Sequence, residues 1–180
     1  DQENRSWNAR LTTNPDEKGT YGGFFTQEEL NEIVKYAATK GIEVIPEIEM
    51  PAHVSSAIAA YPELACFNQR IGVPSGGVWP ITDIYCAGKE TTFEFLQNVI
   101  DEVITIFPSK YIHIGGDETH LLGHCPICKA KVEKEGVSKL YADHIKLMCD
   151  IVIKLGKIPV LWADIALKYP DALQYLPKQV

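Results

Sequence analysis

The sequence predicts an α/β fold with parallel strands, because helix-type and strand-type patterns alternate three times along its 180 residues. This spacing of helices and strands is typical of parallel strands joined by right-handed crossovers. Two long insertions, 50–90 and 117–137, follow the carboxyl ends of the first two expected strands. Loops at this end of the strands commonly carry the site of an α/β fold, so a site is expected there.

The first unit is predicted to be a helix followed by a strand. The stretch 26–29, Thr-Gln-Glu-Glu, has the form of a capping box that begins a helix. Apolar residues then recur at helical spacing as far as Gly41, which marks the end of the helix. Residues 42–49 alternate instead and predict a strand with Glu47 and Glu49 on its polar face.

The same pattern returns twice. A helix over 91–107 precedes a strand over 111–115, and a helix from about 138 to 155 precedes a strand over 158–162. The sequence contains no internal repeat, low-complexity tract or linker. Residues 1–180 are therefore expected to form a single domain.

Polar residues on one face of each strand distinguish between two architectures. An open sheet has helices on both faces, whereas a barrel has a lumen in which polar side chains converge near the strand ends. The residues with this shared parity are Glu47 and Glu49, His113 and Asp117, and Trp162 and Asp164. A whole barrel needs ~250 residues. The prediction is therefore part of a (β/α)8 TIM-type barrel, about three αβ units with long loops after the strands.

Composition excludes several classes of partner. Seventeen Lys and Arg residues against 24 Asp and Glu residues give a net charge of −7, and this balance argues against nucleic acid and against an anionic membrane surface. No window approaches the ~18 consecutive apolar residues of a membrane span. The chain begins at Asp1 and shows no signal peptide, so its localisation stays open.

The five cysteines are too few for a disulfide scaffold and, by their spacing, too scattered for a four-ligand zinc site. Cys125 and Cys128 form one C-x-x-C, for which a loop turn is the favoured interpretation. A metal site that also uses the nearby His120 and His124 is the alternative.

The other cysteines have different expectations. Cys66 and Cys86 bracket a loop and could pair in an exported protein. Cys149 and His144 belong to the apolar pattern of the third helix. We expect Cys149 to pack in the core, and His144 to be a core histidine with its hydrogen bonds satisfied.

The segment that carries most information about chemistry is the second strand and its end. An apolar strand runs into Gly115-Gly116 and then into the adjacent acids Asp117 and Glu118. Glycines allow a sharp turn and a close approach by a ligand, and adjacent acids can address one bound molecule from different directions. A turn with a solvated acidic pair is the plainer alternative. A phosphate cradle fits poorly, because no Lys or Ser follows at P-loop spacing.

This segment, H-I-G-G-D-E, resembles the active-site signature of family-20 glycoside hydrolases, the β-N-acetylhexosaminidases. Further stretches resemble the same family in the same order. They are G-G-F-F-T-Q-E-E-L at 22–30, P-E-I-E-M-P-A-H at 46–53, A-Y-P-E-L at 60–64, D-I-Y-C-A-G at 83–88, C-P-x-C at 125–128 and, more loosely, V-L-W-A-D-I at 160–165. The resemblance covers most of residues 20–165.

The resemblance implies roles for the acidic pair. Glu118 would protonate the departing glycosidic oxygen and then act as base towards water. Asp117 would hold the N–H of the substrate's 2-acetamido group, whose oxygen attacks the anomeric carbon, with net retention. This substrate-assisted scheme is an exception to the usual mechanism with two carboxylates.

Four further site residues follow from the resemblance. His53 corresponds to a histidine that supports the catalytic acid, and Trp162 to a tryptophan that packs against the sugar, although core packing is equally common for such a residue. Glu49 and Asp164 are weaker candidates for lumen hydrogen bonds or substrate contacts. His113 is expected to fill the barrel interior.

The activity implied is that of an exo-β-N-acetylhexosaminidase acting on terminal GlcNAc or GalNAc, with no metal and no organic cofactor. Its partners would be N-acetylhexosamine-containing glycans or oligosaccharides, and its localisation periplasmic, secreted or lysosomal. The alternatives are a disaccharide-releasing relative and a non-catalytic carbohydrate-binding or structural fragment.

The match also departs from the family. An upstream arginine and a downstream tyrosine of the family have no counterpart here, and Ala163 and Asp164 stand where Asp and Glu are usual. The chain thus resembles the middle of a catalytic domain. A partial barrel has open edges, so self-association is expected.

Overall fold

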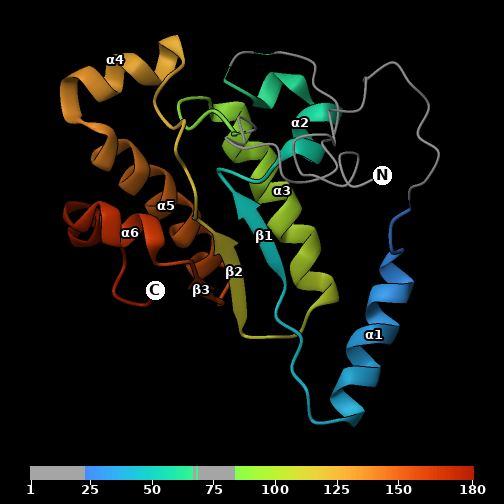
Figure 1. The fold of residues 1–180 in the computed structure, drawn as a ribbon. Coiled ribbons are helices and arrows are strands. Elements are labelled where there is room, and N and C mark those ends of the chain that lie inside the picture. Colours follow the sequence, from blue (N-terminus) through green and yellow to red (C-terminus); the bar gives the residue numbers. More distant parts are fainter. Residues whose placement is uncertain (1–22, 67, 69–83) are drawn as a thin grey trace, which may run out of the picture.

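The computed structural model describes residues 23–66, 68 and 84–180 (Figure 1). The order of elements is α1 (Gln27–Thr39), β1 (Glu47–Met50), α2 (Ser55–Ala60), η3 (Pro62–Leu64), α3 (Glu90–Ile106), β2 (Tyr111–Gly115), α4 (Pro126–Glu135), α5 (Val137–Lys154), β3 (Ile158–Val160), α6 (Asp164–Lys168) and η4 (Pro170–Tyr175). Among these elements, no helix is both long and apolar enough to cross a bilayer.

The three strands form one parallel sheet in the order β1-β2-β3, which confirms the prediction of parallel αβ units. Glu47 of β1 lies opposite His113 of β2, and Tyr111 of β2 lies opposite Ile158 of β3. The carboxyl ends of all three strands therefore lie at the same end of the sheet, where α2 and α4 also lie (Figure 1).

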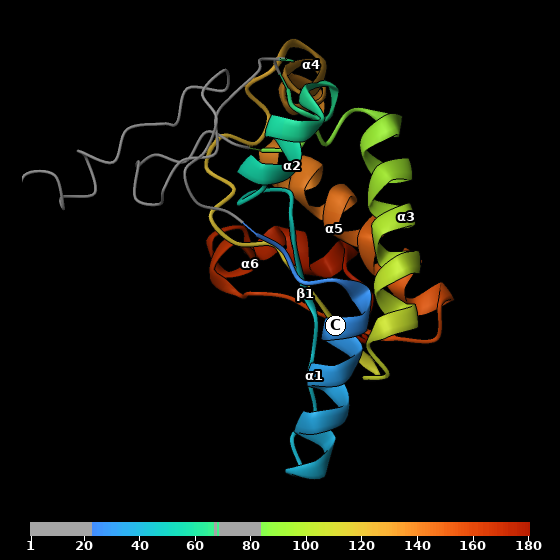
Figure 2. The ribbon, with the colours of Figure 1, turned by 90° about the vertical axis from the view of Figure 1, so that its right-hand side faces the viewer.

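One face of the sheet is covered by helices and the other carries polar side chains. In Figure 2, α3 and α5 lie on the same side of the strands. Ile112 and Ile114 of β2 are fully buried in a core shared with Leu96 of α3 and Met148 of α5. Between them, His113 has the opposite parity and is only partly buried. This is the layering of a barrel wall, with helices outside and a lumen face inside.

The predicted first helix is confirmed in detail. Thr26 Oγ1 accepts a hydrogen bond from the Glu29 backbone N–H at 3.1 Å, and Glu29 Oε2 accepts from the Thr26 N–H at 2.7 Å. Gly41 follows the helix with φ of 72°, a conformation that glycine adopts without strain. No residue of α1 is buried, however, so its apolar stripe has little cover in the described chain.

Two strands are shorter than predicted. β1 begins at Glu47, where its pairing with β2 begins opposite His113. Ile42 and Ile45 are accordingly exposed. β3 ends at Val160, although the Trp162 N–H still donates to the Gly115 carbonyl at 2.8 Å.

The insertions contain helices that the sequence did not predict. The connection between β1 and α3 includes α2 and η3, and the connection between β2 and α5 includes α4. The loop-turn interpretation of Cys125 and Cys128 was wrong, because Cys125 is the N-cap of α4 and Pro126 its first residue. Proline is favoured at this position, since its missing N–H has no partner inside the helix.

The cysteine prediction was also wrong. The Sγ atoms of Cys66, Cys86, Cys125 and Cys128 all lie within 4.8 Å of one another, although the four residues come from two different insertions. All five cysteines are free, so Cys66 and Cys86 form no disulfide. His120 and His124 are not members of this cluster.

His144 is buried as predicted, but its hydrogen bonds are not satisfied. Neither ring nitrogen has a hydrogen-bond partner in the described part of the chain, and the ring instead contacts Phe93 at a centroid distance of 5.3 Å. Burial lowers the pKa of His144 to about 4, so the ring is neutral at neutral pH. The prediction failed because the apolar face of α5 is covered by α3, which offers this ring an aromatic neighbour.

Candidate active site

The carboxyl ends of β1 and β2 bring an imidazole between two carboxylates. His53, just after β1, has its Nε2 at 3.2 Å from Asp117 Oδ2 and at 3.3 Å from Glu118 Oε2. The side chains of His53 and Asp117 are 25% and 22% exposed, and that of Glu118 is 41% exposed. Glu118 is therefore the most open of the three groups to a bound molecule.

The backbone reaches these positions through unusual conformations. Gly115 and Gly116 have φ of 66° and 93°, and the non-glycine residues His53 and Glu118 have φ of 58° and 47°. Left-handed backbone at non-glycine residues is uncommon and often marks functional sites. The Gly116 carbonyl accepts a hydrogen bond from Tyr141 Oη at 3.1 Å, which ties the turn to α5.

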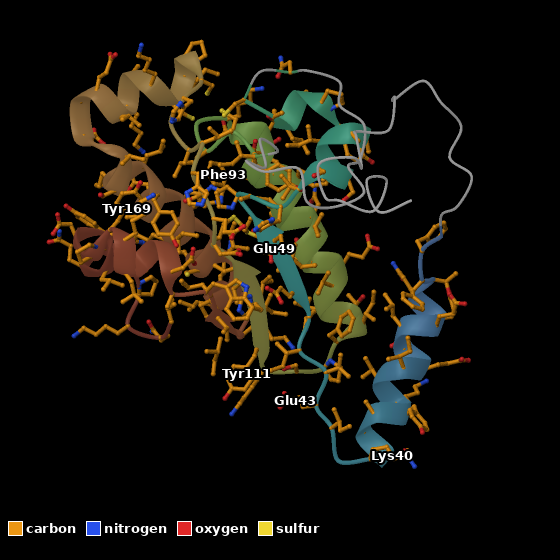
Figure 3. All side chains as sticks on the ribbon, viewed as in Figure 1. Lys40, Glu43, Glu49, Phe93, Tyr111 and Tyr169 are labelled. Atoms are coloured by element: carbon orange, nitrogen blue, oxygen red, sulfur yellow. The ribbon has the colours of Figure 1, made fainter. Side chains whose placement is uncertain are left out.

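Glu49 of β1 is a neighbour of Asp117. Its Oε2 atom is buried without a hydrogen-bond partner among the described residues. Burial, followed by the neighbouring carboxyl groups of Asp117 and Glu47, raises the pKa of Glu49 to about 8. Glu49 is consequently protonated at neutral pH, which avoids a further negative charge at this crowded position. Figure 3 shows Glu49 far from Tyr111, at the other end of the sheet.

The lumen face below the acidic pair is built from three strands. Trp162, two residues after β3, donates from Nε1 to Glu47 Oε1 at 2.7 Å. Its indole lies 4.8 Å from the His113 ring, centroid to centroid, and is tilted by 54°. Trp162 remains 49% exposed. An exposed aromatic surface held by polar contacts is suited to the apolar face of a sugar.

Asp164 connects the third strand to the acidic pair. Its Oδ2 accepts a hydrogen bond from the Glu118 backbone N–H at 3.2 Å. Asp164 thus helps to fix the backbone at Glu118. From the sequence, Asp164 was expected to make a substrate contact or a lumen hydrogen bond.

The structure brings together every residue that the sequence selected for the site. His53, Asp117, Glu118, Glu49, Asp164 and Trp162 all lie at the carboxyl ends of the strands. Glu47 was missed as a site residue, although its parity with Glu49 in β1 was the available signal.

The comparisons with known proteins agree on one family. The profile described as "Glycosyl hydrolase family 20, catalytic domain" matches residues 3–179. The chain is 42% identical over 151 residues to the beta-hexosaminidase of Porphyromonas gingivalis, covering 81% of this chain and 19% of that protein. It is 36% identical over 154 residues to the beta-hexosaminidase of Akkermansia muciniphila, covering 79% of this chain and 30% of that protein. The chain therefore spans less than a third of these relatives.

Solved structures show the same relationship. The beta-N-acetylhexosaminidase of Bacteroides fragilis superposes with a TM-score of 0.70 at 41% identity, covering 84% of this chain and 30% of that one. A Streptomyces plicatus beta-hexosaminidase variant in complex with GlcNAc superposes with a TM-score of 0.66 at 34% identity, covering 82% and 27%. These matches confirm that the three αβ units are part of a TIM barrel. The chain belongs to the catalytic domain of glycosyl hydrolase family 20.

Proposed function

We propose that the protein is an exo-acting β-N-acetylhexosaminidase, which releases terminal GlcNAc or GalNAc from glycans by a retaining, substrate-assisted mechanism. The observation that carries the proposal is the contact of His53 Nε2 with the carboxylates of both Asp117 and Glu118. Family membership and the names of the relatives support the same activity. The non-catalytic alternative is not favoured.

In this mechanism Glu118 is the general acid and base. The acetamido oxygen of the substrate forms a bond to the anomeric carbon while the bond to the leaving oxygen breaks, and Glu118 gives its proton to that oxygen. Water then attacks the same carbon and gives a proton to Glu118, while the bond from that carbon to the acetamido oxygen breaks. The acetamido group is thereby restored, and the configuration at the anomeric carbon is retained. The 41% exposure of Glu118 is consistent with contact to a departing group.

Asp117 acts on the cyclised intermediate. Its carboxylate accepts the acetamido N–H and stabilises the positive charge that develops on this group. The side chain of Asp117 is 22% exposed, and its Oδ2 atom lies 3.2 Å from His53 Nε2, so part of this carboxylate is open to a substrate. Electrostatic stabilisation of this kind is often the largest contribution to catalysis.

The other site residues position this pair and the sugar. His53 holds the two carboxyl groups relative to each other, and Asp164 fixes the Glu118 backbone. Trp162 offers its exposed ring to the sugar and acetamido group. Glu49, by remaining protonated, adds no negative charge beside Asp117.

The test compares Glu118→Gln with Asp117→Asn in the full-length protein, using a natural disaccharide and an activated aryl glycoside. Glu118→Gln should reduce cleavage of the disaccharide by ~10²–10⁴-fold, and cleavage of the aryl substrate less, because its leaving group needs little protonation. Asp117→Asn should cost about 3–4 kcal/mol of transition-state stabilisation on both substrates.

Glu94→Gln, which changes an exposed residue of α3, is the control and should leave both rates unchanged. Equal losses on both substrates for Glu118→Gln, or near-normal rates for Asp117→Asn, would contradict the assigned roles. A thiazoline mimic of the cyclised acetamido group should inhibit, and failure to do so would exclude substrate assistance.

A further inference from the structure

The four clustered cysteines lie at the end of the sheet that carries the site, but they are not part of it. Cys86 Sγ is 3.6 Å from both Cys125 Sγ and Cys128 Sγ, and all four sulfur atoms lie within 4.8 Å of one another. Cys86, Cys125 and Cys128 have no exposed surface, and Cys66 is partly buried. Four sulfurs around one zinc ion at ~2.3 Å would be about 3.8 Å apart in tetrahedral geometry. The two distances from Cys86 Sγ are close to this value.

One half of the cluster is held by backbone pairing within the first insertion. Ala65 and Tyr85 form an isolated antiparallel bridge, and the Cys86 N–H donates to the Leu64 carbonyl at 2.9 Å. This pairing sets Cys66 and Cys86, which are 20 positions apart in the sequence, next to each other. A short antiparallel pair that supplies two thiols is a suitable frame for a metal.

The other half is the first turn of α4. Cys125 is the N-cap, and its Sγ accepts a hydrogen bond from the Cys128 N–H at 3.4 Å. A helix N-terminus favours the thiolate over the thiol, and thiolate is the form that binds metal. Together with the buried sulfurs of the first insertion, this turn completes a set of four soft ligands.

Close packing joins the two halves. A Cβ atom at Gly88 would lie 2.7 Å from Ile127 Cγ2 and 3.5 Å from Cys128 Sγ, so a larger residue there would have to displace the Ile127 side chain at the start of α4. Lys89, three residues after Cys86, donates to the carbonyls of Glu63 and Ala65 and to the side chain of Asn68. The ammonium group of Lys89 is thus hydrogen-bonded to residues of the first insertion.

We propose that Cys66, Cys86, Cys125 and Cys128 bind one Zn²⁺ ion as a structural tetrathiolate centre. Four protein ligands leave no open position, which is typical of structural rather than catalytic zinc. The ion would connect the loop after β1, which carries His53, to the loop after β2, which carries Asp117 and Glu118. This proposal departs from the expectation that the protein uses no metal, and it is independent of the proposed activity.

The first experiment measures metal in the full-length protein, purified under reducing conditions without chelator or a polyhistidine tag. Elemental analysis should find about one zinc ion per chain. Replacement by Co²⁺ should give the visible absorption bands of tetrahedral cobalt together with sulfur-to-cobalt charge transfer in the near ultraviolet. These spectra report the ligands directly and do not depend on activity.

The second experiment compares Cys128→Ala with Cys149→Ala. Cys149 is equally buried but lies in α5 outside the cluster, so its variant controls for the loss of a core thiol. Cys128→Ala should lose the metal and the cobalt spectrum, whereas Cys149→Ala should keep both. Adding a strong chelator should lower the Tm of the parent and of Cys149→Ala, but not that of Cys128→Ala if this variant folds.

Three results would overturn the proposal, and the first two need no variant. The parent protein could contain no metal and take up no cobalt while its thiols are free. An intact mass measured under non-reducing conditions could show that the four thiols are consumed in two disulfides. Finally, Cys128→Ala could retain zinc with the parent's cobalt spectrum.

Discussion

At the scale of single residues, the site concentrates carboxyl groups around one imidazole and keeps one of them neutral. His53 contacts both Asp117 and Glu118. Glu49 is another neighbour of Asp117, and its pKa is raised to about 8. Because Glu49 holds its proton, it adds no further negative charge beside Asp117. The protonation of Glu49 is therefore part of how the pair is maintained.

The raised pKa of Glu49 predicts a specific pH dependence of stability. The unfolded chain releases this proton near the ordinary pKa of 4.5, and the folded protein releases it only near pH 8. The folded state therefore binds more protons between these values, and this contribution to stability is lost as pH rises from about 4.5 through about 8. Glu49→Gln removes this titration. As pH rises through this window, the free energy of unfolding of Glu49→Gln should therefore increase relative to that of the parent.

Denaturant unfolding of both proteins between about pH 4 and pH 9 measures this difference. Glu94→Gln, at an exposed position of α3, serves as the matched control and should follow the parent. A difference between Glu49→Gln and the parent that does not change with pH would show that Glu49 is not held protonated.

At the scale of elements, the end of β2 determines how the acids are presented. Gly115 has φ of 66°, and a Cβ atom there would lie 2.1 Å from Glu49 Oε2. Glycine is thus required twice, once for the backbone conformation and once for the space that the Glu49 carboxyl group occupies. The strand end and the buried acid of the neighbouring strand form one unit.

Gly115→Ala should accordingly damage both stability and activity. Left-handed backbone at alanine costs about 1–2 kcal/mol, and the Cβ atom would also displace the Glu49 carboxyl group. We expect a loss of kcat/KM of at least about tenfold, since small misplacements of catalytic groups are costly. Denaturant unfolding and hydrolysis of an aryl N-acetylglucosaminide measure the two effects.

Gly41→Ala is the matched control for Gly115→Ala. Gly41 has a similar φ of 72°, but a Cβ atom there would meet nothing within 4 Å. Gly41→Ala should therefore lose only the free energy that the left-handed backbone costs, less than Gly115→Ala loses, and should keep its activity. If Gly115→Ala were as active as Gly41→Ala, the link between Gly115 and Glu49 would be wrong.

At the scale of the whole molecule, the described sheet is a piece of barrel wall. In this part of the chain, β1 and β3 each pair only with β2, so one edge of each is open. Apolar side chains are exposed as well, including Phe24 at 89%, Tyr36 at 65% and Trp162 at 49%. Open strand edges and apolar surface both favour association.

We predict that the 180-residue chain, made alone, associates with itself. Light scattering coupled to size-exclusion chromatography over a concentration series should show species larger than a monomer. A stable monomer at every concentration would mean that these edges and apolar groups are covered within the chain, and it would favour the prediction that residues 1–180 form a domain by themselves.

The sequence by itself determined the three helices that precede the strands, the parallel arrangement and the acidic pair, because these depend on local signals. The capping box at 26–29 and the apolar period of α5 are properties of short windows, and both were confirmed. Asp117 and Glu118 were found because two glycines and two acids follow an apolar strand directly. Strand lengths were predicted less well, because β1 begins where its pairing with β2 begins and not where the alternation of the sequence begins.

Only the tertiary structure decided the cysteine cluster, the protonation of Glu49 and the surroundings of His144. Each depends on residues that are distant in sequence. Cys86 contacts Cys125, which is 39 positions away in the sequence. The pKa of Glu49 is raised by burial and by a carboxyl group that follows the neighbouring strand. The His144 ring contacts Phe93 of another helix. Parallel pairing of β1 with β2 stacks the loops that follow them. The contacts between these loops depend on this pairing of the strands, and no local pattern in the sequence of either loop predicts them.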